Sequence, residues 1–466
     1  MNRKLQGALG AVSLAVLAGC ANLAPSYERP AAPVPQTYPA VTNGAASDAV
    51  RPWRAQFDDP KLVQLIELAL AHNRDLRVAT LSIEQARSQY RVQDAARLPT
   101  LGVTGSGSHA RNPADLSASG QAAISHSSSV SVGISAYELD FVGRVRNLSE
   151  QALAQFLTTQ EAQRATQITV VAETARAYLG WAADLQRLAL AGQVLDSYRQ
   201  SVSLTERRLA AGADNALTLR QQQASLESAR GDVARQRAQV EQDRQALALL
   251  LGTAVPEAMA PAPLDPAATP AGSPLAAGLP SELLLRRPDL LQSEQQLKAA
   301  TANIGVARAA FYPRITLTAG AGTASAELSG LFKGGSGSWS FAPQITLPIF
   351  DGGANRANLK AAQAARDIAV ARYEQAIQTA FREVADALTV RESLQDRLAA
   401  QQALVHASAE ALRLARARYE RGADSWLQVL DVQRTYESAR QGLVDLRQSQ
   451  IANSITLYKA LGGGAA

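Results

Sequence analysis

Cysteine is almost absent from this 466-residue chain, and Cys20 is its single example. One thiol excludes an internal disulfide and any metal site built on several cysteines. The four histidines, His72, His109, His126 and His406, lack the spacing of metal ligands, and the motifs HExxH, GxSxG and the phosphate loop do not occur. The sequence therefore predicts no enzyme, no metal site and no cofactor.

Aromatic residues and long hydrophobic runs are scarce as well. Aromatics make up 5% of the chain although hydrophobic residues make up 47%, which favours closely packed, alanine-rich helices over a core of bulky rings. The 46 basic and 41 acidic residues are interleaved, so we expect solvated helix faces and no nucleic-acid surface. No segment reaches the length of a transmembrane helix, so a membrane-spanning part would have to consist of strands.

The first twenty residues have the organisation of an export signal. The basic residues Arg3 and Lys4 precede an apolar run at 8–17 and the small residues before Cys20. We therefore expect residues 1–19 to be a signal peptide. The sequence Leu-Ala-Gly-Cys resembles a bacterial lipoprotein box, which implies acylation of Cys20, and the absence of Asp after it implies sorting to the outer membrane. The alternative is a chance cysteine beside an ordinary cleavage site.

The rest of the chain is predicted to be a tandem duplication. Three short segments recur with one offset of about 210 residues: Gly-Ala-Asp at 212–214 and 422–424, Glu-Ser-Ala-Arg at 227–230 and 437–440, and Leu-Gly at 251–252 and 461–462. We assign residues 20–60 to an anchor and extended strap, 61–252 to the first repeat, 253–280 to a Pro- and Ala-rich linker, and 281–466 to the second repeat.

Each repeat is expected to contain one long strand hairpin. Apolar and small polar residues alternate within residues 99–138 and again within 314–348, with an exposed loop at 110–127 in the first hairpin and a glycine-rich loop at 330–337 in the second. The strands have roughly the ten residues that a tilted strand needs to cross a bilayer. Four strands cannot close a barrel, so we expect other copies of the chain to complete it.

Very long helices are expected after each strand hairpin. No proline occurs between Pro113 and Pro256 or after Pro348. Within the first tract, apolar residues follow three- and four-residue steps, which predicts helix packed on helix. A helix of about 65 residues extends about 100 Å. Gly212 and Gly422 are the expected turning points, because glycine accepts left-handed backbone angles.

Together these features resemble a known family. The resemblance is carried by the lipobox at Cys20 and by residues 53–60, 138–144, 278–289, 350–353, 419–422 and 430–434. It is to the outer-membrane factor (TolC-like) family, and within it to the lipidated branch, the NodT-type outer-membrane lipoproteins of resistance-nodulation-division (RND) efflux systems. The similarity covers nearly the whole mature chain, and Arg-Arg-Pro-Asp at 286–289 is specific to that branch.

The resemblance implies a mainly α fold with a transmembrane β-barrel. A homotrimer would combine four strands per chain into a twelve-stranded outer-membrane barrel, continued by a long helical barrel in the periplasm of a Gram-negative bacterium. The linker and the terminal straps would form a belt around it. The implied partners are outer-membrane lipid, a periplasmic adaptor (membrane fusion) protein and an inner-membrane RND transporter, and the implied role is passive exit of drugs or other toxic small molecules.

The resemblance also places a periplasmic gate near the second turn. It implies Leu427, Asp431 and Arg434 at the constriction, with Tyr419 and Asp424 as further candidates. Asp431 and Arg434 are three residues apart and can share a helix face. The corresponding residues of the first repeat are Gln221 and Ala224, so only the second helical hairpin would carry the gate. An ordinary surface pair is the alternative explanation.

Adaptor docking is implied at the helical turns, at Gly212, Asp214 and Gly422, for which turn formation alone is the alternative explanation. Two other functions stay open at this stage. One is the outer-membrane channel of a type I protein secretion system, and the other is a lipidated periplasmic adaptor, which should lack strand hairpins of membrane-spanning length.

Overall fold

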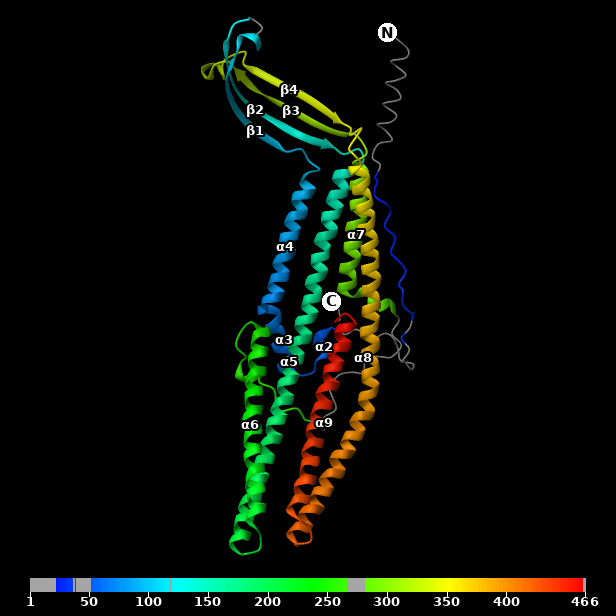
Figure 1. The fold of residues 1–466 in the computed structure, drawn as a ribbon. Helices are drawn as coiled ribbons and strands as arrows, with labels where there is room; N and C mark the ends of the chain where they lie inside the picture. The colour runs from blue at the N-terminus through cyan, green and yellow to red at the C-terminus, as the bar shows by residue number, and fades with distance from the viewer. Residues whose placement is uncertain (1–21, 37, 39–51, 117–119, 266–280, 464–466) are drawn as a thin grey trace. The chain divides into compact units, whose positions relative to one another are not determined.

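The computed structural model describes residues 22–36, 38, 52–116, 120–265 and 281–463 (Figure 1). The predicted signal peptide, Cys20 and residues 266–280 of the linker lie outside this part of the chain. The chain divides into two compact units, each described here by itself. One comprises Met1–Ala31, Ser82–Gln160 and Gln292–Glu374, and the other Ala32–Leu81, Glu161–Leu291 and Gln375–Ala466.

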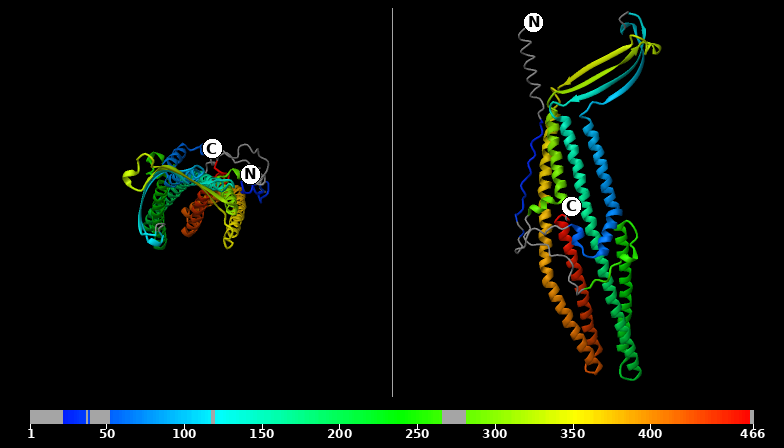
Figure 2. Two further views of the ribbon diagram at one scale, coloured as in Figure 1. Left: turned by 90° about the horizontal axis from the view of Figure 1, so that it is seen from above. Right: turned by 180° about the vertical axis from the view of Figure 1, so that it is seen from behind.

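The first unit contains a four-stranded antiparallel sheet. Its strands are β1 (Leu101–Asn112), β2 (Ala123–Leu139), β3 (Arg314–Ser325) and β4 (Gly337–Thr346), and they pair in chain order, so β1 and β4 are the edges. The strands lie side by side and curve together (Figures 1 and 2). The strands of the first hairpin extend further than predicted, into the expected loop 110–127, because pairing continues to Asn112 and Ala123.

The two faces of the sheet differ in polarity. Directly opposed residues in neighbouring strands share a face. One face carries Leu101, Val103, Val130, Val132, Ile134, Ala319, Ala321, Trp339, Phe341 and Ile345. The other carries Gly102, Thr104, Ser106, Ser129, Ser131, Gly133, Gly320, Gly322, Ser338 and Ser340. The alternation predicted from the sequence therefore gives one mainly apolar face and one polar face, and the apolar face becomes polar at Ser128, His109, His126 and Arg111 toward the loop end of the first hairpin.

A bulge in β2 changes which residues face which way. The register shifts by one residue between Ile134 and Tyr137, and Ala136 has a left-handed φ of 52°. Beyond the bulge, Tyr137 stands opposite Leu317 on the apolar face, and Glu138 stands on the polar face. An unbroken alternation would have placed Glu138 among apolar residues, so the extra residue keeps a carboxylate off that face.

Glu138 joins the two repeats beside the sheet. The Arg144 guanidinium donates two hydrogen bonds to its carboxylate, at 2.7 and 2.6 Å, and Arg314 Nε donates a third at 2.6 Å. Arg144 begins the helix after β2, and Arg314 begins β3. A largely buried carboxylate that accepts three charge-assisted bonds holds these segments in fixed register.

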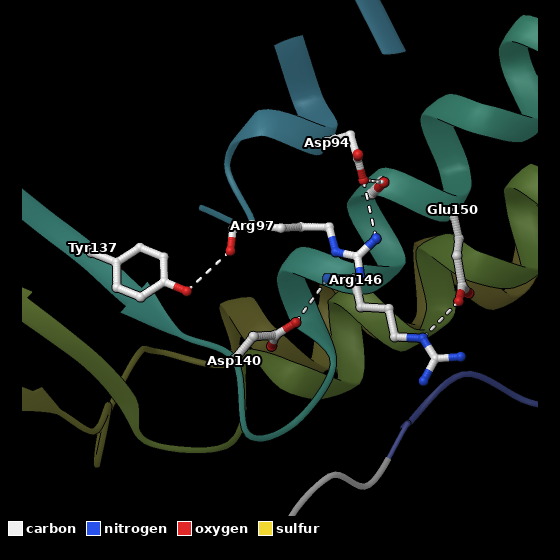
Figure 3. A network of polar contacts seen from close by, with 7 residues as sticks. Asp94, Arg97, Tyr137, Asp140, Arg146 and Glu150 are labelled. Atoms are coloured by element: carbon white, nitrogen blue, oxygen red, sulfur yellow. Dashed lines mark hydrogen bonds and ion pairs between the residues drawn. The ribbon is translucent and has the colours of Figure 1, made fainter. Parts of the chain in front are cut away.

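A second polar network holds the transition from β2 to helix (Figure 3). Tyr137 donates a hydrogen bond to the carbonyl oxygen of Arg97, and the backbone N–H of Arg146 donates to Asp140. Asp94 accepts hydrogen bonds from Arg97 and from Ser149. The end of one helix, the strand and the start of the next helix are thereby tied together.

The helices follow the same order in both halves of the chain. They are α2 (Trp53–Gln56), α3 (Pro60–His72), α4 (Arg74–Ala95), α5 (Arg144–Ala210), α6 (Ala216–Leu251), α7 (Pro288–Ala309), α8 (Ala354–Glu420) and α9 (Trp426–Ala460). The orders α4-β1-β2-α5-α6 and α7-β3-β4-α8-α9 match, and α5 and α8 each have 67 residues. Among the helices of the described chain, none is long and apolar enough to cross a membrane.

Helix α5 packs on more than one side within the second unit. Val171, Ala175 and Tyr178, which follow the three- and four-residue steps noted in the sequence, are buried, but so are Ala172 and Trp181 on other sides. The core there joins residues of α3, α5, α6 and α9. The buried surface of α5 therefore extends beyond the single heptad stripe. A helix with neighbours on several sides needs small or apolar residues on nearly all of its faces.

The strap 22–31 is fastened to α7 in the first unit. Tyr27 and Arg29 donate hydrogen bonds of 3.1 and 2.7 Å to the buried carboxylate of Glu294, which also pairs with Lys298. Burial opposes ionisation of Glu294, but these hydrogen bonds and charges lower its pKa. The strap is thus held by an ionised carboxylate with several donors.

Candidate functional site

The predicted gate and docking residues lie at the turns of the two long helical hairpins, in the second unit. The α5–α6 turn contains Gly212 and the α8–α9 turn contains Gly422, with φ values of 72° and 73°. Both glycines therefore adopt the left-handed conformation that the sequence predicted for them. Near the turns, one apolar cluster contains residues of all four helices, including Tyr198, Val233, Tyr419 and Trp426.

An arginine and an aspartate span each turn in the same way. Arg418 donates hydrogen bonds of 2.6 and 3.1 Å to Asp424 across the second turn. In the first turn, Arg208 lies 3.6 Å from Asp214. The two pairs occupy equivalent positions of the duplication. The hydrogen bond with Arg418 lowers the pKa of Asp424, so this carboxylate is ionised.

Tyr419 breaks the symmetry between the repeats. Its hydroxyl donates a 2.9 Å hydrogen bond to Asp214 of the other hairpin, and the Arg208 guanidinium lies over its ring at 4.8 Å. The equivalent residue of the first repeat is Leu209, which has no hydroxyl. Burial, followed by the bond to Asp214, raises the pKa of Tyr419. Tyr419 therefore stays protonated and fastens one turn to the other.

Asp214 receives several donors at this junction. Partial burial disfavours its charged form, but hydrogen bonds from the Asn215 backbone and from Tyr419 lower its pKa overall. An ionised Asp214 is thus surrounded by a backbone N–H, a phenol and a guanidinium. These contacts place Tyr419 and Asp214 together, whereas Asp424 pairs within its own turn.

The three residues expected at the constriction are presented outward. Leu427 is 64% exposed, and Asp431 and Arg434 are exposed on the same helix, α9. The Asp431 carboxylate and the Arg434 guanidinium form no ion pair with each other. Arg434 instead lies near enough to Glu437 to favour its ionised form, although burial raises the pKa of Glu437 overall. Within one chain these three side chains leave a leucine and two opposite charges open to other molecules.

The comparisons with known proteins agree with this architecture. The sequence model of one family, described as Outer membrane efflux protein, matches residues 65–253 and 279–463. The chain belongs to this family. The match in two segments also supports the duplication.

Similar proteins are found over the full length of this outer membrane efflux protein. It is 47% identical to the outer membrane protein OprJ of Pseudomonas aeruginosa over 99% of this chain and 97% of that protein. It is 45% identical to the probable efflux pump outer membrane protein TtgC of Pseudomonas putida over 97% and 94%. The crystal structure of the open state of the Neisseria gonorrhoeae MtrE outer membrane channel matches with a TM-score of 0.86, 39% identity and coverage of 95% and 98%.

The family assignment confirms several sequence predictions. This is an efflux protein of the outer membrane and not an enzyme. It also confirms the TolC-like resemblance and the outer-membrane location. Among the residues that the structure describes, no group of three or more His, Cys, Asp or Glu side chains could hold a metal ion.

Sequence reasoning missed the two arginines of the turns and a buried hydrogen-bonded pair near the first turn. Gln222 donates a 2.6 Å hydrogen bond to Thr205, joining α6 to α5 just above the first turn. Arg208 and Arg418 were identifiable, because they share the offset of about 210 residues that relates Asp214 to Asp424. The bond between Tyr419 and Asp214 has no such signal, since it joins different repeats at non-equivalent positions.

Proposed function

We propose that this outer membrane efflux protein is the exit duct of a tripartite efflux pump. Three copies would form one channel that passively conducts drugs or other toxic small molecules outward. The observation that carries this proposal is the four-stranded sheet, which has two unpaired edges and faces of opposite polarity.

The unpaired edges support a closed ring of copies. Strands β1 and β4 are antiparallel in a four-stranded meander, so β4 of one copy can pair antiparallel with β1 of the next. An open edge within lipid leaves backbone groups without hydrogen-bond partners, which closure removes. Threefold symmetry then gives twelve strands, a size that leaves space for an aqueous passage.

The two faces support an aqueous interior and a lipid-facing exterior. The apolar face would contact the membrane, and the face of serine, threonine and glycine would line the passage. Small hydroxyl side chains offer no shaped pocket or charge to select one compound. Selection of cargo would therefore belong to an inner-membrane RND transporter and its periplasmic adaptor, for which the turns at Gly212, Asp214 and Gly422 are the proposed docking sites.

The turns are also the proposed gate. Leu427, Asp431 and Arg434 project from one chain without pairing to each other, so a threefold axis would bring three sets together. Each exposed ion pair contributes only about 0.2–1 kcal/mol. The binding of a docking partner could therefore open a tip that is closed by such pairs. Tyr419 and Asp214 would hold the two hairpins of each chain in the closed arrangement.

Lipidation of Cys20 is a further part of the proposal. Asn22 packs against Gly143, and Arg308 donates a 2.9 Å hydrogen bond to the carbonyl oxygen of Leu23. Gly143 lies between the end of β2 and the start of α5. Residues 22 and 23, which follow Cys20 in the sequence, are thus held near the junction of β2 and α5. An acyl chain on Cys20 would anchor the protein in the outer membrane ahead of this strap.

Drug susceptibility of a deletion strain tests the exit-duct function. Loss of the gene should sensitise cells to small toxic compounds, and the intact gene should restore resistance. Secretion of proteins through a type I system should stay unchanged. A strain with normal susceptibility to a broad compound panel and a defect in protein export would contradict the proposal and favour the secretion channel.

Substitution of both Asp431 and Arg434 by alanine tests the gate. We expect a higher single-channel conductance in planar bilayers, because the closed tip loses its cross-chain pairs. The matched control replaces the equivalent Gln221 with alanine in the first repeat, where the native Ala224 already lacks a charge. Unchanged conductance in the double variant would remove the gate assignment.

A further inference from the structure

Two histidines meet across the first strand hairpin. His109 on β1 and His126 on β2 are 17 residues apart in sequence but directly opposed in the register. Their ring centroids are 4.7 Å apart and the ring planes are inclined by 70°. The two Nδ1 atoms lie 2.5 Å from each other. Both rings thus direct the same nitrogen toward one point on the surface of the sheet.

This arrangement is close to that of two ligands on one metal ion. Imidazole nitrogen binds such ions at about 2.0–2.1 Å, so two ligands on one ion lie about 2.8–3.4 Å apart, from square-planar to tetrahedral arrangements. The Nδ1 atoms need to separate by about 0.3–0.9 Å to admit an ion. Both side chains are exposed and can make this adjustment, while the paired backbone keeps their Cβ atoms about 5 Å apart.

We propose that His109 and His126 form a two-imidazole site for a divalent transition cation, with Cu²⁺ bound more tightly than Ni²⁺ or Zn²⁺. Neutral imidazole suits these three ions, and affinity at nitrogen ligands rises from Ni²⁺ to Cu²⁺ and falls at Zn²⁺. In the described chain, no third His, Cys, Asp or Glu completes the set. Water fills the remaining positions, so the bound ion exchanges readily.

The site is separate from the proposed passage. His109 and Val103 are six residues apart on β1 and share the apolar face with His126. At about 3.4 Å per residue, the pair lies about 20 Å along the strand from Val103. A strand needs about 9–11 residues to cross a bilayer, and His109 is eight residues beyond Leu101. The pair therefore lies near the far end of a span that begins at Leu101, toward the loop end of the hairpin, on the face that carries the apolar residues and not on the polar face.

Electron paramagnetic resonance of bound Cu²⁺ tests the site directly. The full mature protein is purified in detergent without a polyhistidine tag and titrated with one equivalent of Cu²⁺ per chain. We expect hyperfine coupling to two imidazole nitrogens. His109→Ala and His126→Ala should each remove one coupled nitrogen. The affinity for Cu²⁺ should fall by at least about 10- to 100-fold. Loss of an outer-shell partner already weakens a metal site by this factor.

His72→Ala and His406→Ala are the matched controls, because these histidines lie in or near helices and far from the pair in sequence. They should leave the two-nitrogen signal unchanged. His109→Asn, which keeps a polar side chain, serves if an alanine variant does not assemble. Wild-type protein without coupling to two nitrogens, or a His109/His126 double variant with unaltered Cu²⁺ affinity, would overturn the proposal. Neither result would bear on the exit-duct function.

Discussion

At the scale of single residues, one substitution between the repeats has the largest structural consequence. Leu209 and Tyr419 occupy equivalent positions, but only the tyrosine carries a hydroxyl that reaches Asp214. Other polar contacts between the hairpins lie further along the helices, such as the hydrogen bonds from Arg416 to Ser197 and from Arg440 to Gln193. The Tyr419 hydroxyl adds a directional bond between the hairpins, which a partner must break to separate them.

Tyr419→Phe should therefore loosen the contact between the two turns. The variant keeps the ring under Arg208 but removes the hydrogen bond, at a cost of about 1 kcal/mol. Single-channel conductance should rise, because the open arrangement gains population. Tyr436→Phe is the control, since the Tyr436 ring also lies beside an arginine but its hydroxyl has no hydrogen-bond partner in the structure. Equal conductance in the two variants would show that the hydroxyl does not hold the tip.

A second residue-scale feature is a pair of carboxyl groups between α5 and α6. Burial, and then the neighbouring Asp184, raise the pKa of Asp243 to about 6. One carboxyl oxygen of Asp243 is buried without a hydrogen-bond partner, and the other accepts a bond from Gln239. Arg187 neutralises Asp184, to which it donates a 2.5 Å hydrogen bond. Asp243 is thus left without a full counter-charge.

Asp243→Asn should raise stability above pH 6 and leave it unchanged near pH 4. The folded pKa exceeds the unfolded value of about 3.9, so the charged form is disfavoured by folding and stability falls as pH rises through this interval. Because solvent reaches the group, we expect a gain on the order of 1 kcal/mol. Urea unfolding followed by circular dichroism at both pH values measures it. Asp232→Asn on the same helix is the control, and an equal gain at both pH values would contradict the assignment.

At the scale of elements, the bulge in β2 explains how a strand can serve a membrane face and a charged junction. Apolar residues occupy even positions from Val130 to Ile134 and odd positions from Tyr137 to Leu139. One extra residue in β2 lets the apolar residues at even and at odd positions lie on the same face. Ala136 adopts the strained conformation at this bulge. The strain is offset by the three hydrogen bonds that Glu138 then accepts on the polar face.

Ala136→Val should destabilise the sheet. A β-branched residue with positive φ is a genuine outlier, and strain of this kind costs roughly 1–3 kcal/mol. The midpoint of urea unfolding in detergent should fall, as followed by the mobility of the folded species on unheated gels. Ala321→Val, in an extended segment of the neighbouring strand β3, should have little effect. A similar loss in both variants would indicate that added volume, and not backbone conformation, is responsible.

At the scale of the whole molecule, exposed apolar residues mark where copies should join. Ile349 and Phe350, just after β4, are 94% and 92% exposed. When β4 pairs with β1 of the next copy, its end lies beside the beginning of that strand. Leu98 and Leu101 of the neighbour, which are exposed in the single chain, are then close to Ile349 and Phe350. In the proposed trimer, the edge strands and these side chains would therefore form one continuous interface.

Replacement of Ile349 and Phe350 by serine should reduce trimer formation. Burial of a large apolar side chain contributes about 1.5–3 kcal/mol, and each of three interfaces would lose two. Analytical ultracentrifugation in detergent should show a larger monomer fraction. Phe332→Ser, in the β3–β4 connection, is the control for loss of an exposed phenylalanine elsewhere. Trimers of wild-type stability in the double variant would exclude this contact.

The sequence alone was sufficient for the duplication, the long helical hairpins, the strand hairpins and the family, because these depend on periodicity and recurring motifs. Gly212 and Gly422 were predictable for the same reason, since a left-handed turn favours one residue type. Only the tertiary structure revealed the bond from Tyr419 to Asp214 and the meeting of His109 with His126. These contacts form only when separate segments of the chain pack or pair in one particular alignment. The spacing of residues along the sequence does not specify that alignment.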